Sequence, residues 1–311
     1  MKSLFNKKNF LFYLSLITFI FVVSVGLGLM GYSPKLQVVE KVINNKKSYS
    51  SLPVLSAGSY FPVMSAQAAL AVDLGSMTTL YEKDPDKALL PASTTKIVAA
   101  LVAMDYYPDD FIIEVGKFKV DGQKMGLKMG EKISVKNLLY GLLVYSANDA
   151  AEVLAMSYPG GRIGFIAAMN KKAHDLHLEN SLFANPSGLD GNGDKIVTTA
   201  RDLVRISIVA MQNPEFADIV KTKEITVESI DGKIFHKLTN INELVGKVEG
   251  VLGVKTGWTE SARENLVTYI ERDGHKVMIA LLGSQDRFGE TKELISWIFN
   301  NYHWQEVRVP D

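Results

Sequence analysis

The chain has 311 residues, with 34 basic and 34 acidic side chains and no cysteine. This length suffices for one sizeable domain, or two small ones, with appendages. The balanced charge gives no reason to expect a nucleic-acid partner, and the lack of cysteine excludes disulfides, thiolate catalysis and cysteine-ligated metals.

The histidines do not form a metal-binding pattern. His174 and His177 share one face of a predicted helix, but no acidic residue completes an H-E-x-x-H motif beside them. Zinc sites need a fuller set of ligands than this pair supplies. We therefore predict no metal and no other cofactor.

The N-terminal segment has the composition of a membrane anchor. Residues 1–9 include three lysines, and residues 10–32 form an uncharged, mostly apolar run. As a helix this run would extend about 34 Å, enough to cross the hydrocarbon core of a bilayer. No small-residue cleavage site follows closely, which favours an uncleaved signal-anchor over a cleaved secretion signal. We expect residues 1–9 to be a short cytoplasmic lead and residues 10–32 a transmembrane helix.

Residues 33–62 have the composition of a linker. They are largely polar, follow no sustained period and contain scattered proline, glycine and serine. Periodic patterns of apolar residues begin shortly afterwards. The sequence therefore predicts a single folded domain over residues 63–311, joined by this linker to the N-terminal segment.

Strands are predicted at both ends of the folded domain and helices in its middle. The predicted strands cover residues 68–73, 78–81, 225–229, 233–237, 253–256, 265–272 and 275–282. The predicted helices cover residues 91–104, 134–144, 150–156, 165–176, 200–211 and 290–302, with Ser134 as an N-cap. This order predicts an α/β fold in the α+β sense: an antiparallel sheet built from both ends of the domain, flanked by helices and carrying a helical insertion.

Ser93 and Lys96 form the first of three short motifs with chemical meaning. Pro91 favours a helix start just before them, and the i, i+3 spacing places Lys96 on the same face as Ser93. The free N–H groups of a helix N-terminus favour negative charge on a reacting oxygen. A lysine acts as a base only if burial or a second cation destabilises its ammonium, and Lys255 is the candidate cation. The pattern predicts Ser93 as a nucleophile and Lys96 as its base.

The second motif is Ser146-Ala147-Asn148, in a short turn between two predicted helices. Side chains in such a turn can point into a cleft. The Ser146 hydroxyl can relay a proton between Lys96 and a leaving amine, and the Asn148 amide can bind a peptide carbonyl of a substrate. Serine and asparagine are also common helix caps, so this motif is informative through its position between the other two.

The third motif, Lys255-Thr256-Gly257, follows a β-rich run and is predicted on an edge strand. A lysine and a hydroxyl there can bind a carboxylate while the backbone pairs with an extended substrate. The N–H of Trp258 can join that of Ser93 in an oxyanion hole. Each motif alone is weak, but the three in this order indicate acyl transfer through a serine.

These motifs resemble those of the serine D-alanyl-D-alanine carboxypeptidases, low-molecular-mass penicillin-binding proteins with a β-lactamase/transpeptidase-like fold. The resemblance runs from about residue 65 to residue 304 and extends beyond the motifs to residues 80–83, 125–128, 141–143, 185–189 and 199–202. Membership implies removal of the terminal D-alanine from peptidoglycan stem peptides ending in D-Ala-D-Ala, through an acyl-serine. It also implies covalent inhibition by β-lactam antibiotics.

The resemblance further implies roles for individual residues. Arg287 resembles a family arginine that helps to bind the terminal carboxylate of the substrate. The implied catalytic residues are Ser93, Lys96, Ser146 and Asn148, and the implied substrate-binding residues are Lys255, Thr256, Gly257, Trp258 and Arg287. The location of peptidoglycan implies a single-pass protein of the cell membrane with its catalytic domain outside, or a secreted protein if the N-terminal segment is cleaved.

The sequence departs from the family pattern after the third motif. The family commonly has an Ala-Gly pair there, whereas here Ala262 is followed by Arg263, which can alter the turn beside the cleft. Many relatives also carry a C-terminal β-domain and an amphipathic membrane helix. In this chain we expect the anchor at the N-terminus instead.

Other activities stay open at this point. A β-lactamase would share the acylation but would need a glutamate and an asparagine for deacylation; Glu179-Asn180 is the nearby candidate, and its spacing does not match. A catalytically idle cell-wall-binding homologue would not need the reactive residues, all of which are present. An endopeptidase that cleaves peptidoglycan cross-links is a variant of the carboxypeptidase hypothesis, and it also stays open.

Overall fold

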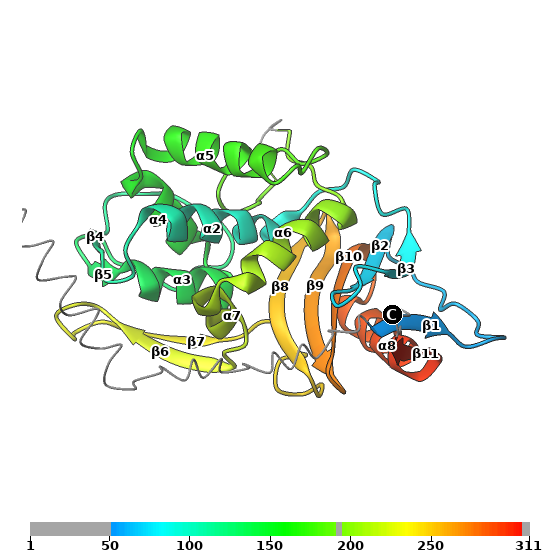
Figure 1. The fold of residues 1–311 in the computed structure, drawn as a ribbon. Helices are drawn as coiled ribbons and strands as arrows, with labels where there is room; N and C mark the ends of the chain where they lie inside the picture. The colour runs from blue at the N-terminus through cyan, green and yellow to red at the C-terminus, as the bar shows by residue number, and fades with distance from the viewer. Residues whose placement is uncertain (1–50, 191–194, 307–311) are drawn as a thin grey trace, which may run out of the picture. The chain divides into compact units, whose positions relative to one another are not determined.

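The computed structural model describes residues 51–190 and 195–306. Its centre is a five-stranded antiparallel sheet with the strand order β3-β2-β10-β9-β8 (Figure 1). The strands are β2 (Ala68–Asp73), β3 (Thr79–Lys83), β8 (Val251–Thr259), β9 (Arg263–Arg272) and β10 (His275–Ser284). Two of them come from the start of the domain and three from its end, which confirms the predicted sheet.

Both faces of this sheet are covered. Strand β2 is buried along its whole length. Leu70 and Val72 belong to one hydrophobic core, whereas Ala69 and Ala71 belong to a second core on the other face. Because successive side chains of a strand point to opposite faces, a strand between two cores has to be apolar at nearly every position.

Helices cover the two faces unequally. On one face of the sheet, helix α6 packs against β2 and β10, and α7 packs against β8. On the other face, α8 packs against β9 and β10. The helices are α2 (Lys96–Tyr106), α3 (Val135–Leu143), α4 (Asn148–Ser157), α5 (Gly161–Asp175), α6 (Ala200–Gln212), α7 (Pro214–Val220) and α8 (Arg287–Asn301). The predicted helical insertion between the two groups of strands is therefore confirmed.

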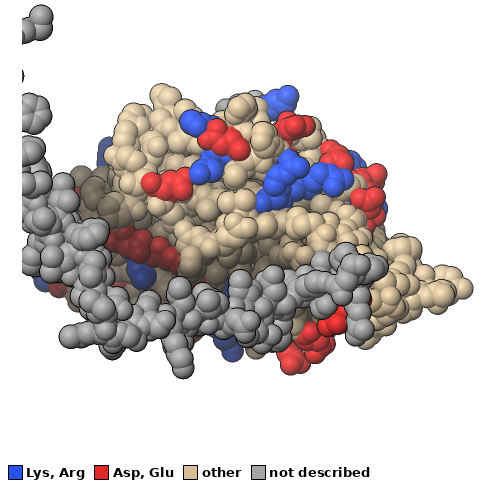
Figure 2. All heavy atoms as spheres, in the orientation of Figure 1, with Lys and Arg blue, Asp and Glu red and all other residues tan. Residues whose placement is uncertain are grey.

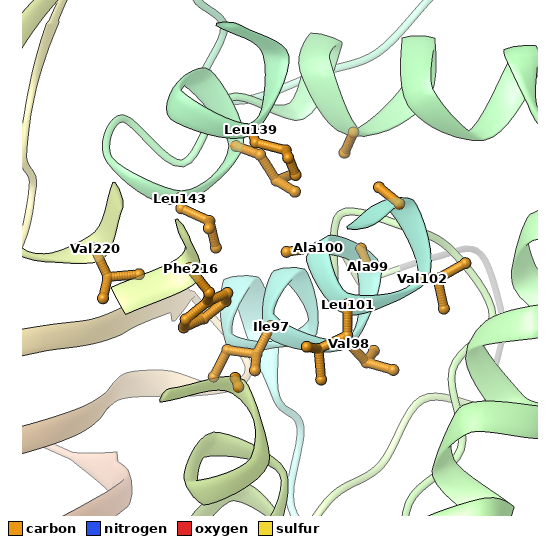
Figure 3. Close-up of a cluster of buried hydrophobic side chains, with 14 of the residues drawn as sticks. Ile97, Val98, Ala99, Ala100, Leu101, Val102, Leu139, Leu143, Phe216 and Val220 are labelled. Carbon is orange, nitrogen blue, oxygen red and sulfur yellow. The ribbon is translucent and has the colours of Figure 1, made fainter. Parts of the chain in front are cut away.

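Helix α2 is the centre of the larger core (Figure 3). It packs against α3, α4, α5 and α6, and its residues from Lys96 to Ala103 are all buried. A helix that is apolar all round is the kind that a domain encloses completely. The burial of α2 matters for function, because Lys96 is its first residue.

Local signals explain several element boundaries. The Ser134 hydroxyl accepts a hydrogen bond from the N–H of Asn137, which confirms the predicted N-cap of α3. The hairpin of β6 (Glu224–Glu228) and β7 (Phe235–Thr239) confirms the predicted strand pair. Helix α7 and the short pair β4 (Ile112–Glu114) and β5 (Lys132–Ser134) were not predicted.

The linker predicted over residues 33–62 is wrong from residue 51 onward. Ser51–Leu55 form strand β1, which pairs with β11 (Tyr302–Glu306) near the other end of the chain. The indole N–H of Trp297 donates to the carbonyl of Tyr60 at 2.7 Å, and the rings of Phe61 and Trp297 lie 5.0 Å apart. The pairing partner is remote in sequence, so local composition did not reveal it. The remaining linker residues, 33–50, lie outside the described residues.

The predicted cytoplasmic lead (residues 1–9) and transmembrane helix (residues 10–32) also lie outside the described residues. Within residues 51–190 and 195–306, none of the helices has the length and apolar character needed to cross a bilayer.

Candidate active site

A cleft of about 760 Å³ lies where strand β8 meets the helices. Strand β8 is an edge of the central sheet, so one side of its backbone is not paired within that sheet. The cleft is lined by Ser93, Gly122, Gln123, Ser146, Asn148, Leu189, Asp190, Ile241, Thr256, Gly257, Trp258, Thr259, Glu260 and Arg287. The structure thus brings residues of all three motifs, and Arg287, into one cavity.

Ser93 lies in a short 3₁₀-helix, η1 (Ala92–Thr95), which continues directly into α2. Its Oγ is 2.9 Å from Nζ of Lys96, which confirms that the two side chains share a face. Ala92 has a φ of +48°, an uncommon conformation for a residue with a side chain. Backbone strain of this kind concentrates at functional sites, where surrounding structure holds it in place.

Lys96 is fully buried and contacts three oxygen atoms. Its Nζ is 2.9 Å from Oγ of Ser93, 2.7 Å from Oδ1 of Asn148 and 2.8 Å from the carbonyl oxygen of Ser187. The carbonyl oxygens of Asn148 and Ser187 can only accept hydrogen bonds. A neutral lysine gives its two N–H bonds to those acceptors and keeps its lone pair for the Ser93 hydroxyl. This geometry suits a base that takes the proton of Ser93.

Burial lowers the pKa of Lys96 to about 7, because a charged ammonium loses its hydration inside the protein. The negative charges of Asp149 and Glu152 oppose this change without cancelling it. We predicted that burial or a second cation would destabilise the ammonium, and burial is the cause found for Lys96. Lys255 is also buried, and the charges of Lys96 and Arg287 add to burial in lowering its pKa well below the usual value.

The loop that follows α5 presents the Ser187 carbonyl to Lys96. Oδ1 of Asn185 accepts hydrogen bonds from the N–H groups of Ser187 and Gly188, which closes a tight turn. Gly188 has a φ of +79°, and a Cβ there would lie 1.9 Å from the carbonyl oxygen of Ala92. This position therefore requires glycine, and the loop is locked against the segment that carries Ser93.

Ser146 and Asn148 lie at the start of α4, as the second motif predicts. Ser146 has a φ of +62°, and its Oγ accepts a hydrogen bond from Nζ of Lys255 at 2.8 Å. The Asn148 side chain also makes two hydrogen bonds within the protein. Its Oδ1 accepts from Lys96, and its Nδ2 donates to the carbonyl of Asp121 at 2.8 Å. These two bonds use one of the two N–H donors of the amide, so the other N–H can still donate to a substrate carbonyl in the cleft.

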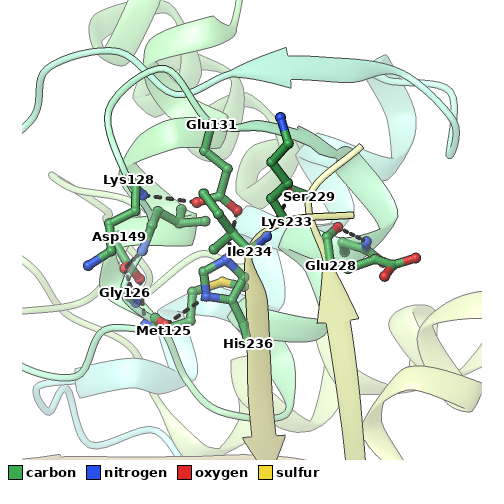
Figure 4. Close-up of polar contacts among 12 residues, drawn as sticks. Met125, Gly126, Lys128, Glu131, Asp149, Glu228, Ser229, Lys233, Ile234 and His236 are labelled. Atoms are coloured by element: carbon green, nitrogen blue, oxygen red, sulfur yellow. Dashed lines mark hydrogen bonds and ion pairs between the residues drawn. The ribbon is translucent and has the colours of Figure 1, made fainter. Parts of the chain in front are cut away.

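The loop that contacts Asn148 is clamped from two sides (Figure 4). Asp149, the second residue of α4, accepts hydrogen bonds from the N–H groups of Met125, Gly126 and Leu127. On the other side, the buried His236 of β7 bonds to the Met125 carbonyl and to Oε1 of Glu131 at 3.0 and 2.7 Å. The clamp fixes one wall of the cleft.

The third motif forms the opposite wall. Gly257 on β8 packs so closely against η1 that a Cβ would lie 2.9 Å from the Pro91 carbonyl and 3.2 Å from the N–H nitrogen of Ser93. Glycine therefore allows strand β8 to approach the segment of Ser93. The Trp258 side chain is 61% exposed at the rim of the cleft.

Two buried polar groups in the cleft have no hydrogen-bond partner among the described residues: Oγ1 of Thr256 and Nε of Arg287. Arg287 also donates from Nη1 to the Gly257 carbonyl at 2.9 Å, which holds its guanidinium over the third motif. Buried polar groups are normally paired, so an unpaired donor in a cleft is suited to a ligand. A carboxylate fits both groups, and Nζ of Lys255 lies close by, 2.9 Å from the Thr256 carbonyl.

Neither the β-lactamase candidate nor the histidine pair lies in this cleft. Glu179, His174 and His177 line a different depression, beside the end of α5. Among residues 51–190 and 195–306, no group of three or more histidine or acidic side chains is placed to hold a metal ion.

Known proteins match both the sequence and the fold of this chain. Residues 57–286 match the family model described as D-alanyl-D-alanine carboxypeptidase. A D-alanyl-D-alanine carboxypeptidase of Mycobacterium tuberculosis is 34% identical over 260 residues, which cover 81% of this chain and 88% of that protein. A D-alanyl-D-alanine endopeptidase of Escherichia coli is 31% identical over 250 residues, or 76% of this chain and 78% of the other.

Solved structures agree. The crystal structure of a putative penicillin-binding protein homologue from Mycobacterium tuberculosis superposes with a TM-score of 0.74 at 34% identity, covering 83% of this chain and all of that one. The crystal structure of a DD-transpeptidase from Streptomyces superposes with a TM-score of 0.71 at 30% identity. The match covers 78% of this chain and 99% of that one. The chain therefore belongs to the D-alanyl-D-alanine carboxypeptidase family. It is a serine-type D-Ala-D-Ala carboxypeptidase of the penicillin-binding class.

Several groups that shape the site escaped the sequence analysis. They are the backbone carbonyls of Asp121 and Ser187, the carboxylate of Asp149, and the cleft residues Gly122, Gln123, Ile241 and Glu260. The match of residues 125–128 and 185–189 to the family pattern was the available signal for the two loops.

Proposed function

We propose that this cleft removes the terminal D-alanine from peptidoglycan stem peptides through an acyl-serine on Ser93, and that β-lactams acylate the same atom. The observation that supports this most directly is the 2.9 Å contact between Oγ of Ser93 and Nζ of the buried Lys96. A lysine with a pKa of about 7 is partly neutral at physiological pH and can accept the serine proton.

The reaction has two steps. In the first, Oγ of Ser93 bonds to the carbonyl carbon of the penultimate D-alanine as its proton passes to Lys96. The C–N bond to the last D-alanine then breaks, and Lys96 passes its proton to the leaving nitrogen through the hydroxyl of Ser146, which lines the cleft and is bonded to Lys255. In the second step, Lys96 takes a proton from water as the water oxygen attacks the ester carbon. The bond from that carbon to Oγ of Ser93 then breaks, Oγ takes the proton back from Lys96, and the shortened peptide leaves.

The groups around the nucleophile suit the charges that develop. We assign the N–H groups of Ser93 and Trp258 to the oxyanion hole, where one donor contributes on the order of 3–4 kcal/mol of transition-state stabilisation. Lys255, Thr256 and Arg287 bind the terminal carboxylate of the substrate, which supports a preference for cleavage at a free C-terminus.

An endopeptidase acting on cross-links is the second candidate. The similarity to proteins named D-alanyl-D-alanine endopeptidases supports it. A β-lactamase receives no such support, because Glu179 lies outside the lining of the cleft.

We further propose that residues 10–32 anchor the protein in the cell membrane with the folded domain on the outer side. The uncharged run of 23 residues after a lysine-rich lead supports a membrane span, and the location of peptidoglycan sets the orientation.

The test is release of D-alanine from an N-acylated peptide ending in D-Ala-D-Ala, with Ser93→Ala as the matched variant. We expect release by the natural protein and loss of at least about 1,000-fold in the variant, as expected for removal of a covalent nucleophile. Cleavage of a cross-linked dimer peptide with no release of free D-alanine would favour the endopeptidase. Equal release by both proteins would overturn the acyl-serine.

A further inference from the structure

The segment 52–63 exposes apolar side chains to an unusual degree, and we name it the apolar end. Tyr60 and Val63 are 91% and 93% exposed, and Phe61 is 57% exposed. Leu52 and Val54 on strand β1 are 41% and 38% exposed. Single exposed apolar residues are ordinary, but several within one short segment indicate an interaction surface.

The apolar end is also free of charge. No Lys, Arg, Asp or Glu occurs between Lys47 and Asp73. In Figure 2 the protrusion at the right of the view, where β1 ends in Figure 1, has no coloured charged side chain. A surface that is apolar, aromatic and uncharged is suited to the interfacial region of a lipid bilayer, where tyrosine and other amphipathic rings are enriched.

The apolar end is held rigidly against the far edge of the sheet. The Tyr81 hydroxyl donates to the Pro62 carbonyl at 3.2 Å, and Nζ of Lys83 donates to the Met64 carbonyl at 2.7 Å. Both donors lie on β3, the edge strand opposite to β8. The ring of Phe61 packs against Trp297, so the protruding residues stand on a fixed aromatic base.

We infer that the apolar end rests on the outer surface of the lipid bilayer. This inference builds on the proposed anchor at residues 10–32. Eighteen residues, 33–50, separate that anchor from β1, and even fully extended they reach only about 60 Å. A tether this short raises the effective concentration of membrane at the apolar end, so a weak contact suffices to dock the domain.

Docking in this way would orient the cleft. Strands β3 and β8 are separated by four strand intervals, on the order of 19 Å. With β3 turned to the bilayer, the cleft on β8 opens away from it. The domain would then present its active site to peptidoglycan beyond the membrane rather than to the lipid surface.

The chain contains no cysteine, so single cysteines can report on this surface in the full chain. We would introduce Tyr60→Cys and Val63→Cys, attach an environment-sensitive fluorophore, and reconstitute each protein in vesicles containing lipids with quenching groups on their acyl chains. Ile163→Cys and Met129→Cys, at positions 82% and 79% exposed on other elements, are the matched controls. Covalent labelling by penicillin confirms that each variant is folded.

We expect blue-shifted emission and at least about twofold acyl-chain quenching for labels at residues 60 and 63, and neither effect at residues 163 and 129. Because the apolar end is uncharged, the quenching should be equal in zwitterionic and anionic vesicles.

Vesicles that carry the protein but leave all four labels in water would overturn the docking and leave the anchor intact. Blue-shifted emission at residues 60 and 63 without acyl-chain quenching would indicate a protein partner or a second copy. That result would also overturn the docking on lipid. A chain that does not float with vesicles would overturn both the anchor and the docking, while D-alanine release would still test the catalytic proposal separately.

Discussion

The buried amine of Lys96 determines how acylation should respond to pH. Burial lowers its pKa to about 7, so the proton is bound below this pH and lost above it. Only the neutral amine can accept the proton of Ser93. We expect the second-order rate of acylation by penicillin to rise about tenfold per pH unit below 7 and to level off above it. A stopped-flow pH profile measures this. A rate that climbs steadily to pH 10 would show a lysine of ordinary pKa and contradict the account.

Arg287 should act through the carboxylate of the substrate. Replacing it by Gln removes a charged hydrogen-bond donor from the cleft, worth about 1.5–3 kcal/mol. We expect Arg287→Gln to lower kcat/KM for a peptide ending in D-Ala-D-Ala by roughly 10–150-fold. The control is the same peptide with a C-terminal carboxamide, on which the variant and the natural protein should differ little. Equal losses on both peptides would mean that Arg287 supports the fold and not carboxylate recognition.

At the scale of elements, the loop at residues 185–189 should matter for acylation as much as the three motifs do, because it holds the Ser187 carbonyl against Lys96. Gly188 has a φ of +79°, and an added Cβ would collide with the Ala92 carbonyl. Gly274 has a nearly equal φ of +78° but open space around it. Alanine at either position carries the same backbone strain of about 1–2 kcal/mol, and only Gly188→Ala adds a clash of roughly 1–3 kcal/mol.

We therefore expect Gly188→Ala to lower the free energy of unfolding more than Gly274→Ala does, and to slow penicillin acylation by displacing the Ser187 carbonyl from Lys96. Chemical denaturation and acylation kinetics of the pair measure both effects. If the two variants match in stability and in acylation rate, the loop does not hold Lys96.

The elements show what the sequence could and could not predict. The capping serine at residue 134 and the closely spaced strand pairs within residues 68–81 and 265–282 are local patterns, and each was found where predicted. The contacts to Lys96 and Asn148 from residues 187 and 121 come from backbone carbonyls. Every residue has a carbonyl group, so residue type alone did not reveal which ones would bind.

At the scale of the whole molecule, strand β1 joins the two ends of the folded domain. Its pairing with β11 and the packing of Phe61 on Trp297 make residues 51–62 part of the domain. The motifs predicted the chemistry of the site because they place reactive groups at short spacings. The extent of the domain depends on a pairing across almost the whole chain, which no local pattern encodes.

A chain that starts at residue 63 should therefore be less stable than one that starts at residue 50. We expect a loss of roughly 2 kcal/mol or more, which lowers Tm by about 4–8 °C in a domain of this size. Differential scanning calorimetry of the two proteins measures the difference. An identical Tm would show that residues 51–62 do not stabilise the domain and belong to the linker.

The central claim, that Ser93 forms an acyl-enzyme, is tested most directly by the intact mass of the protein after brief exposure to penicillin. The account predicts one stable penicillin equivalent on the natural protein and none on Ser93→Ala. No adduct with the drug left intact, or an undiminished adduct on Ser93→Ala, would contradict it.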